Sequence, residues 1–442
     1  MSTHSAPTRI HDVIGIGIGP FNLGLAALSE PLGIDALFLD RADDFRWHHG
    51  MMLEGSTIQV PFLADLVTMA DPTSRFSFLN WLKHTGRLYP FYIREDVYPL
   101  RAEYDAYCRW VSEQLPTLRW GREVVAVEHD PTDDTYLVRA MRTDSGTEET
   151  YRARHVVLGV GTQPVVPPAL QGLAGPVVHS ADYLPERERL RAAASVTVVG
   201  SGQSAAEIYL DLLQGIREGG YRLDWITRSP RFFPMEYTKL TLEMTSPEYT
   251  DHFHALPIGM RQHLGRDQRG LYKGISGDLV NEIYDTLYRL SASGPVATTL
   301  LTDTAVESAE WDAERFRLQL HHSQLDQRYE RETHALVLAT GYSARTPTFL
   351  EPIRGALDFD ALGRLDVARD YSVDGGRGRV FVQNGEEHTH GLTAPDLGFG
   401  AWRNSSILAS ITSREVYPIE RRIAFQEFGL PHDALIPAEV GR

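Results

Sequence analysis

The clearest pattern along the chain is a short apolar run, a glycine-rich turn and an amphipathic stretch, and it occurs twice. In HDVIGIGIGPFNLGLAAL, the apolar run 13–16 predicts a buried strand and 23–28 predicts a helix. In SVTVVGSGQSAAEIYLDLL, the same pattern predicts a strand at 196–199 and a helix at 204–213. A further strand is expected after each helix, at 36–39 and 223–226. This pattern predicts an α/β protein.

Both turns have the composition of a pyrophosphate-binding loop. Gly17, Gly19 and Asn22 occupy the three turn positions of G-x-G-x-x-G/A, with Asn22 a departure at the third position. Gly200 and Gly202 lie in the second turn. Glycines let the backbone approach phosphate oxygens, and the following helix offers free N–H donors. One such turn is weak evidence, but two of them predict two Rossmann-like dinucleotide-binding domains.

The residues beyond the next strands distinguish the two ligands. Asp40 ends the strand at 36–39, about 20 residues after Gly19, which is the spacing of a ribose-binding carboxylate. The strand at 223–226 is followed instead by Arg228 and Arg231, where the 2′-phosphate of NADP would lie. We therefore expect FAD in the first domain and NADPH in the second.

Two Gly- and Pro-rich segments, at 158–170 and 335–347, predict crossings between the domains. The expected order is the first part of an FAD-binding domain at 1–168, an NADPH-binding domain at 169–337, and a return to the FAD-binding domain with a C-terminal segment at 338–442. A polar, Pro-interrupted helical region at 232–295 is expected to form a small substrate cap on the second domain.

The composition of the chain limits which binding partners and cofactors are expected. The 442 residues carry a formal charge of −16, which disfavours nucleic acid. The single cysteine, Cys108, excludes an internal disulfide framework and a redox-active cysteine pair. No secretory leader or membrane-spanning run is evident, so we expect a cytoplasmic protein without membrane association. Neither histidine pair, 48–49 or 388/390, has a third ligand at suitable spacing, so no metal is expected.

Six blocks together resemble the microbial N-hydroxylating flavin monooxygenases, the lysine, ornithine and diamine N-monooxygenases of siderophore biosynthesis. The blocks are GIGPFNL, FRWHHGMM, FLADLVTMADPTSRFSFLNWL, VVGSGQSAAE, LATGY and HTHGLTAPDLGFGAWR. The resemblance implies FAD and NADPH as cofactors, O2 as co-substrate and a primary amine as substrate. It also implies N-hydroxylation through a C4a-hydroperoxyflavin, and a homo-oligomer, either a dimer or a tetramer.

The resemblance also implies roles for individual residues. The residues expected to bind FAD are Gly17, Gly19, Pro20, Asn22, Asp40, Trp47, His48 and Gln59, and Gln59 is also the expected catalytic polar group beside the flavin. The residues expected to bind NADPH are Gly200, Gly202, Gln203, Ser204, Arg228 and Arg231. Thr340, Gly341, Tyr342 and Leu397 are further expected cofactor contacts, and Ala64, Leu242, Glu243 and Gly398 are expected to line the substrate site.

Two departures from the family pattern point to the substrate. Amino-acid-using members read F-x-K-D-L, and that lysine pairs with the substrate carboxylate, whereas this chain has Ala64. Leu242 replaces an asparagine near the α-carbon in ornithine-using members. Since an unpaired, partly buried carboxylate costs several kcal/mol, we expect a diamine, cadaverine or putrescine, whose far amine would pair with Glu243 or Asp65.

Other functions remain open from the sequence alone. A compensating cation from another loop would make the protein an L-lysine N6-monooxygenase. A non-catalytic redox sensor that binds FAD and NADPH is a more distant alternative.

Overall fold

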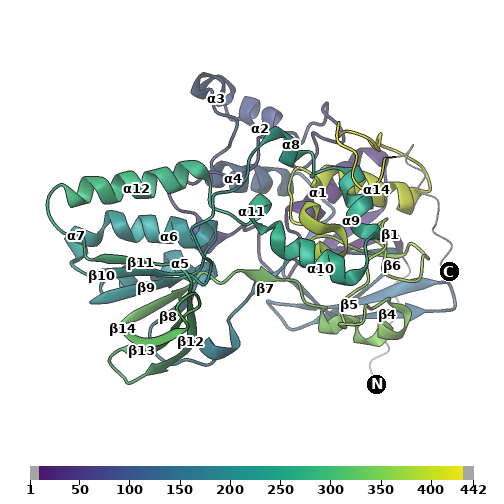
Figure 1. Ribbon diagram of the computed structural model, residues 1–442. Helices are drawn as coiled ribbons and strands as arrows, with labels where there is room; N and C mark the ends of the chain where they lie inside the picture. Colours follow the sequence, from purple (N-terminus) through teal and green to yellow (C-terminus); the bar gives the residue numbers. More distant parts are fainter. Residues whose placement is uncertain (1–8, 432–442) are drawn as a thin grey trace, which may run out of the picture.

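Two parallel β-sheets form the centre of the computed structural model, which describes residues 9–431 (Figure 1). The strands and helices predicted around both glycine-rich turns are confirmed, and their exact bounds are given below. The first helix begins at Pro20, before its apolar pattern, because proline suits the first position of a helix.

The first sheet has five parallel strands extended by an antiparallel hairpin. The parallel order is β3 (Leu118–Arg119), β2 (Ala36–Leu39), β1 (Ile10–Ile16), β6 (Glu148–Leu158) and β17 (Val380–Val382). The N-terminal half of β6 pairs instead with β5 (Thr135–Arg142), which pairs with β4 (Arg122–Asp130). Helices α1 (Pro20–Ser29), α4 (Arg101–Ser112) and α14 (Gly400–Thr412) pack together in this domain.

The second sheet repeats this arrangement. Its parallel order is β11 (Thr298–Leu301), β10 (Arg222–Ile226), β9 (Ser195–Val199), β15 (Ala335–Leu338) and β8 (Val177–His179). An antiparallel sheet of β12 (Thr304–Trp311), β13 (Phe316–His322) and β14 (Gln327–Thr333) leads directly into β15. The helices of this domain are α5 (Tyr183–Arg191), α6 (Gln203–Gln214), α7 (Ile216–Gly219) and α12 (Gly277–Ser291), and α12 packs on α6.

The two crossings between the domains lie side by side. On the first crossing, β7 (Gln163–Pro164) pairs antiparallel with β16 (Tyr342–Ser343) of the return crossing. Figure 1 shows this ribbon between the two domains. Short 3-10 helices complete the connections: η1 (Glu30–Leu32), η2 (His49–Met51), η3 (Pro168–Leu170), η4 (Ser180–Asp182), η5 (Thr348–Ala356) and η6 (Gly391–Thr393).

The region 232–295 divides between the two domains. Its last helix, α12, packs on the second domain, as described above. Its earlier helices are α8 (Lys239–Leu242), α9 (Pro247–Ala255), α10 (Ile258–Asp267) and α11 (Arg269–Tyr272). Of these, α9 and α10 contact α13 (Glu387–His390) and η6 of the first domain. The cap region therefore bridges the domains and reaches the segment that precedes α14.

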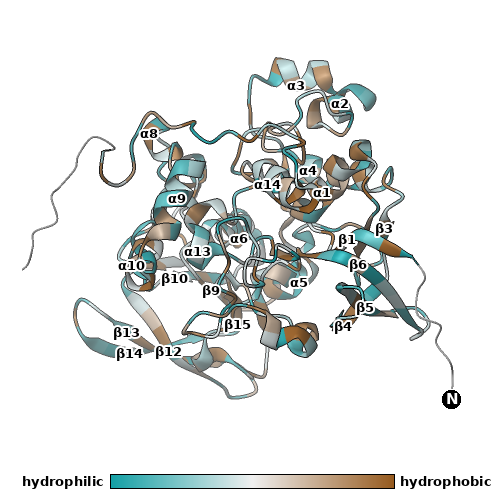
Figure 2. Cartoon of the chain, turned by 90° about the vertical axis from the view of Figure 1, so that its right-hand side faces the viewer, coloured by the Kyte–Doolittle hydropathy of each residue, from teal (hydrophilic) through white to brown (hydrophobic). Residues whose placement is uncertain are grey.

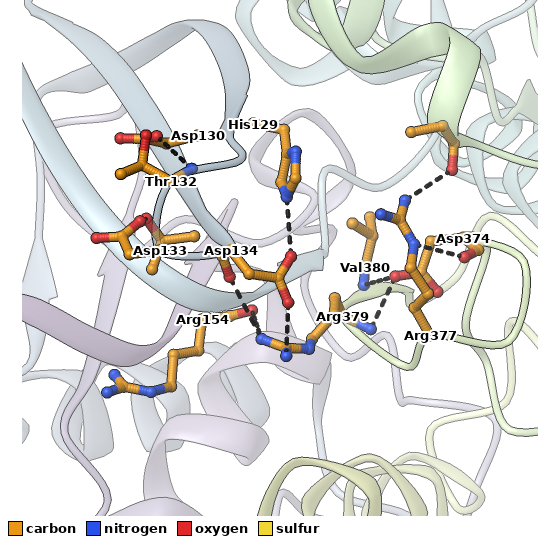
Figure 3. A network of polar contacts seen from close by, with 12 residues as sticks. His129, Asp130, Thr132, Asp133, Asp134, Arg154, Asp374, Arg377, Arg379 and Val380 are labelled. Atoms are coloured by element: carbon orange, nitrogen blue, oxygen red, sulfur yellow. Dashed lines mark hydrogen bonds and ion pairs between the residues drawn. The ribbon is translucent and has the colours of Figure 1, made fainter.

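Two features lie at the periphery of the first domain. Helices α2 (Phe78–His84) and α3 (Leu88–Arg94) project from the body in both views (Figure 2). A second peripheral feature is a polar network around Asp134, in the turn between β4 and β5 (Figure 3). Asp134 accepts a hydrogen bond from the Arg379 side chain (2.9 Å) and pairs with His129 (2.9 Å). Asp374 accepts from the backbone N–H of Arg379 (2.9 Å). This network fastens the hairpin to the loop before β17.

Candidate active site

The first glycine-rich turn leaves the N-terminus of α1 open to an anion. An added Cβ at Gly17, where φ is 89°, would lie 2.4 Å from the Gly159 carbonyl oxygen, so only glycine fits. Gly19 is the N-cap of α1, and an added Cβ there would meet nothing within 4 Å. No side chain caps this helix and no acidic residue lies in its first turn. The uncapped N–H donors and the positive end of the helix dipole suit a pyrophosphate.

Asn22, the departure at the third turn position, is accommodated by a glycine from another strand end. Its buried side chain donates to the Gly17 carbonyl (2.8 Å) and accepts from Gln383 Nε2 (2.8 Å). A Cβ at Gly159 would lie 2.4 Å from Asn22 Nδ2. The space that a third glycine would provide is thus supplied by Gly159, and the amide holds the turn in place.

Asp40 also orders the first turn. One carboxylate oxygen accepts from the Ile18 backbone N–H (2.7 Å), and the other accepts from Ala42 N–H (2.8 Å). The carboxylate lies beside the turn, and its contact with a ribose remains a prediction.

The second turn has the same construction. An added Cβ at Gly200 would lie 2.2 Å from the Ala339 carbonyl oxygen. Gly202 is the N-cap of α6, again without a capping side chain or an acidic first turn, and Ser204 follows within that turn. Gln203 donates to Glu207 (2.9 Å) and accepts from the Ser276 N–H (2.9 Å), which ties this turn to the start of α12.

Two arginines follow β10 at the surface. Arg228 and Arg231 are exposed, and the Arg231 guanidinium lies 4.2 Å from the centre of the Phe233 ring. Within residues 9–431, neither forms an ion pair with a carboxylate. Both charges are therefore available to an anionic ligand.

Aromatic residues from both domains meet where the crossings lie. The rings of Trp47 and His48 are 4.8 Å apart, and His48 lies 6.3 Å from Tyr342 on β16. His48 retains an exposed edge, but burial of the rest of the ring, and the charges of Arg101 and His49, lower its pKa to about 4. His48 is therefore neutral near pH 7.

The segment between β15 and β16 is joined to the first crossing. Thr340 Oγ1 donates to the Val165 carbonyl (2.5 Å), and the Val165 N–H donates to the Gly341 carbonyl (2.9 Å). Gly341 has φ of 88°, which a residue with a side chain rarely adopts.

Gln59 lies against the start of the cap region. Its Nε2 is 3.2 Å from Met235 Sδ, and its carbonyl accepts from the Tyr237 hydroxyl (2.6 Å). Burial raises the pKa of Tyr237, and the electrostatic effects of Tyr98 and Asp396 act in the same direction. Tyr237 of the cap thus contacts Gln59 and lies within electrostatic reach of Asp396.

Ala64 and Gly398, two predicted substrate residues, are neighbours. A Cβ placed on Gly398 would lie 3.6 Å from the Ala64 Cβ, and Ala64 is only 5% exposed. The adjacent Leu397 lines a small cavity of about 10 Å³, with room for one water, between the N-termini of α1 and α14. Pro20 lines the same cavity.

The other predicted substrate residues are engaged or exposed. Leu242 is half exposed at the end of α8. The Glu243 carboxylate accepts from the backbone N–H groups of Phe425 (3.1 Å) and Gln426 (3.0 Å) and so holds the C-terminal segment. Asp65 is buried and accepts from the N–H groups of Val67 and Phe78, among others. Both carboxylates, Glu243 and Asp65, therefore already have hydrogen-bond donors within the protein, and neither is free to bind a substrate amine.

Asp396 is the carboxylate that the sequence analysis missed. Its Oδ1 would lie 2.9 Å from a Cβ on Gly398, which places it beside Ala64. The only signal in the sequence was its position two residues before Gly398.

A larger cavity of about 320 Å³ lies at the carboxyl ends of β6 and β17. Gly161, Arg345, Arg364 and Gln383 are among its lining residues, and Gln383 also binds Asn22 of the first turn. Ligands of open α/β sheets bind outside the carboxyl ends of the strands.

Residues 9–431 contain no cluster of three or more His, Cys, Asp or Glu side chains arranged to hold a metal ion. None of their helices combines the length and the apolar character needed to cross a membrane.

The duplicated sheets and the two uncapped, glycine-rich helix N-termini define a protein with two dinucleotide-binding domains. The chain belongs to the L-lysine 6-monooxygenase/L-ornithine 5-monooxygenase family, whose model matches residues 9–344. It is thus a flavin-dependent N-monooxygenase, as the sequence blocks predicted.

Three proteins of known activity or structure are similar to this chain over most of its length. The putrescine N-hydroxylase of Shewanella oneidensis is 49% identical over 420 residues, covering 95% of this chain and 84% of that protein. The structure of DfoA from Erwinia amylovora, described as a cadaverine monooxygenase of desferrioxamine biosynthesis bound to FAD, matches with a TM-score of 0.95 and 50% identity, over 97% of this chain and 100% of DfoA. The Kutzneria ornithine N-hydroxylase KtzI, with reduced FAD, NADP+ and L-ornithine, matches with a TM-score of 0.84 and 30% identity, over 92% and 99%.

Proposed function

We propose that this protein uses FAD, NADPH and O2 to N-hydroxylate one primary amine of an aliphatic diamine, putrescine or cadaverine, for hydroxamate siderophore biosynthesis. The observation that carries this proposal is the packing of Ala64 against Gly398 beside Asp396. An amino acid bound there would bring its carboxylate to a buried methyl group and a carboxylate. A diamine brings an ammonium instead.

The relatives support the same substrate class. The putrescine N-hydroxylase and the cadaverine monooxygenase are each about half identical to this chain, whereas the ornithine N-hydroxylase KtzI is 30% identical. All three extend over nearly the whole chain.

The residues present fit both dinucleotides. The open helix N-termini at Gly19 and Gly202 would hold the two pyrophosphates, and Arg228 with Arg231 would bind the 2′-phosphate of NADPH. When bound, NADPH supplies a hydride and FAD activates O2 for oxygen transfer. Trp47, neutral His48 and Gln59 would surround the reacting centre without adding a positive charge, and Met235 and Tyr237 of the cap would exclude water from it.

The substrate nitrogen must lose a proton before it can accept oxygen. An alkylamine has a pKa near 10.4, so its neutral form costs about 4 kcal/mol at pH 7.5. Burial of an amine in a site that excludes water disfavours its charged form. Desolvation of the reacting nitrogen, at the end of the diamine away from Ala64 and Asp396, would favour its neutral form.

We also propose that the protein is a cytoplasmic homo-oligomer. The projecting helix α3 exposes Tyr89, Tyr92 and Ile93, each more than 70% accessible in the single chain. Large exposed apolar side chains on one projecting helix are typical of a subunit contact. Light scattering coupled to size-exclusion chromatography would measure the mass in solution.

A four-substrate comparison tests the function. The FAD-loaded enzyme is assayed with NADPH for hydroxylamine product from putrescine, cadaverine, L-lysine and L-ornithine. We expect kcat/KM for at least one diamine to exceed that for both amino acids. Higher turnover of L-lysine would make the protein a lysine N6-monooxygenase, and FAD and NADPH binding without any hydroxylamine would indicate a redox sensor.

A further inference from the structure

Asp396 lies in the short segment between η6 and α14, directly beside the predicted substrate residues. Its Oδ1 accepts from the Phe399 N–H (3.1 Å), which fixes the carboxylate at the start of α14. A Cβ added to Gly398 would lie 2.9 Å from this oxygen and 3.6 Å from Ala64 Cβ. Asp396 and Ala64 therefore both lie beside Gly398.

The carboxylate of Asp396 forms no ion pair within residues 9–431, and its hydrogen-bond donors there are the backbone N–H groups of Phe399 and Gly398. The nearby Arg403 is fully buried, pairs with Glu386 (3.0 Å) and donates to the carbonyls of Thr393 (2.9 Å) and Ala394 (2.7 Å). Arg403 thus supports the backbone just before Asp396 and forms no ion pair with its carboxylate.

The side chain of Asp396 is partly buried. Burial raises the pKa of this carboxyl group, with partial compensation from the backbone N–H groups of Phe399 and Gly398. A carboxylate in such a place is stabilised by a fixed positive charge. The neighbouring side chain at position 64 is a methyl group and supplies no charge, and the Arg403 guanidinium, which acts on Asp396 electrostatically, is paired with Glu386.

We propose that Asp396 binds the distal ammonium group of the diamine and thereby selects diamines over monoamines and amino acids. This inference rests on the proposed function. Ala64 and Asp396 then act together. The short side chain of Ala64 leaves room for the substrate's ammonium group, whereas a lysine at this position would itself pair with the Asp396 carboxylate. In the other two acids considered for this role, Asp65 and Glu243, both carboxylate oxygens already accept hydrogen bonds from the protein.

Substrates that lack the second amine test the proposal without any mutation. The FAD-loaded wild-type enzyme is compared on cadaverine and 1-aminopentane, and on putrescine and 1-aminobutane. Loss of a charge-assisted hydrogen bond predicts kcat/KM about tenfold or more lower for each monoamine. Equal kcat/KM for the diamine and its monoamine would overturn the role of Asp396.

The variant Asp396→Asn should remove this discrimination. We expect kcat/KM for the diamines to fall to the level of the monoamines, mainly through KM, while turnover of 1-aminopentane is retained. Asp396→Glu, which keeps the charge, should retain part of the diamine preference. A tenfold diamine preference that survives in Asp396→Asn would refute the proposal.

Controls separate the possible failures. Glu282→Gln removes one exposed acid from α12 and should leave the diamine-to-monoamine ratio unchanged. Flavin absorbance and amine-independent NADPH oxidation show whether each variant is folded and loaded. If the wild-type enzyme prefers an amino acid, the proposed function fails, whereas a diamine preference unaffected by Asp396→Asn rejects only the role of Asp396.

Discussion

Arg101 on α4 and Glu207 on α6 form a bidentate ion pair that joins the two dinucleotide-binding domains. The Nη1–Oε2 and Nη2–Oε1 distances are 2.9 and 2.7 Å, and the two side chains are only 12% and 6% exposed. Arg101 also donates to the Met51 carbonyl (2.5 Å), and Glu207 accepts from Gln203 beside the second turn. The pair thus links the segment after His48 to the turn expected to bind NADPH.

Glu207→Gln should destabilise the protein strongly. Removing one partner of a nearly buried pair leaves Arg101 with an uncompensated charge, which costs about 3 kcal/mol. Because Gln203 loses its charged acceptor as well, KM for NADPH should rise. Thermal unfolding and NADPH kinetics measure the two effects.

An exposed pair provides a matched control for this substitution. Arg328 and Glu307 also form two contacts, at 2.8 and 3.2 Å, but on the surface of the second domain. Glu307→Gln should cost at most about 1 kcal/mol. Similar losses of stability in both variants would show that burial of the Arg101–Glu207 pair is unimportant.

Much of the fold could be predicted because the relevant signals are local. An apolar run, two glycines and an amphipathic helix specify each strand–turn–helix unit, and the structure contains both units. The division of the cap region could not be predicted in this way. Contacts of α9 and α10 with α13 join segments more than one hundred residues apart, and no local pattern encodes such pairing.

The candidate site shows the same limit. Ala64 and Gly398 can be predicted because each lies in a recognisable sequence motif, although the sequence does not show that they are neighbours. Glu243 is a plausible substrate acid from its residue type and its place in the cap region, but the sequence does not reveal which groups its carboxylate binds. Only the folded chain shows that Glu243 holds Phe425 and Gln426, while Asp396 forms no ion pair within residues 9–431.

Asn22→Gly restores the usual third glycine of the first turn, yet it should weaken the protein. The substitution removes the hydrogen bonds from Asn22 to Gly17 and from Gln383 to Asn22, and it leaves buried polar groups unpaired at a cost of about 1–3 kcal/mol. We expect a lower Tm and weaker FAD binding, measured by thermal unfolding and flavin titration. In this background Gly159→Ala should be tolerated better than in the wild type, since its Cβ no longer meets the Asn22 amide. Purely additive effects of the two substitutions would contradict this account.

His48 should make the protein sensitive to acid. Its pKa is about 4 in the folded protein and about 6.5 in the unfolded chain. As the pH falls below 6.5, the unfolded chain binds the proton first, so stability present at higher pH is lost progressively toward pH 4. The partly exposed ring keeps the effect modest. His48→Asn, which tolerates the φ of 48° at this position, should show a smaller decrease in Tm between pH 6.5 and 4.5 than the wild type. Parallel Tm curves would exclude His48 as a contributor.

Ala64→Lys should convert the substrate site from one that attracts an ammonium into one that repels it. The new side chain starts from a buried position beside Gly398, and its ammonium would pair with Asp396. We expect kcat/KM for cadaverine and putrescine to fall about tenfold or more, since each is then deprived of one charge-assisted contact. Ala64→Met adds nearly the same length without the charge and separates the effect of bulk from that of charge. The argument from charge requires Ala64→Lys to lose more diamine activity than Ala64→Met. Equal losses in the two variants would leave steric exclusion as the explanation, and unchanged diamine kinetics in Ala64→Lys would remove position 64 from the substrate site.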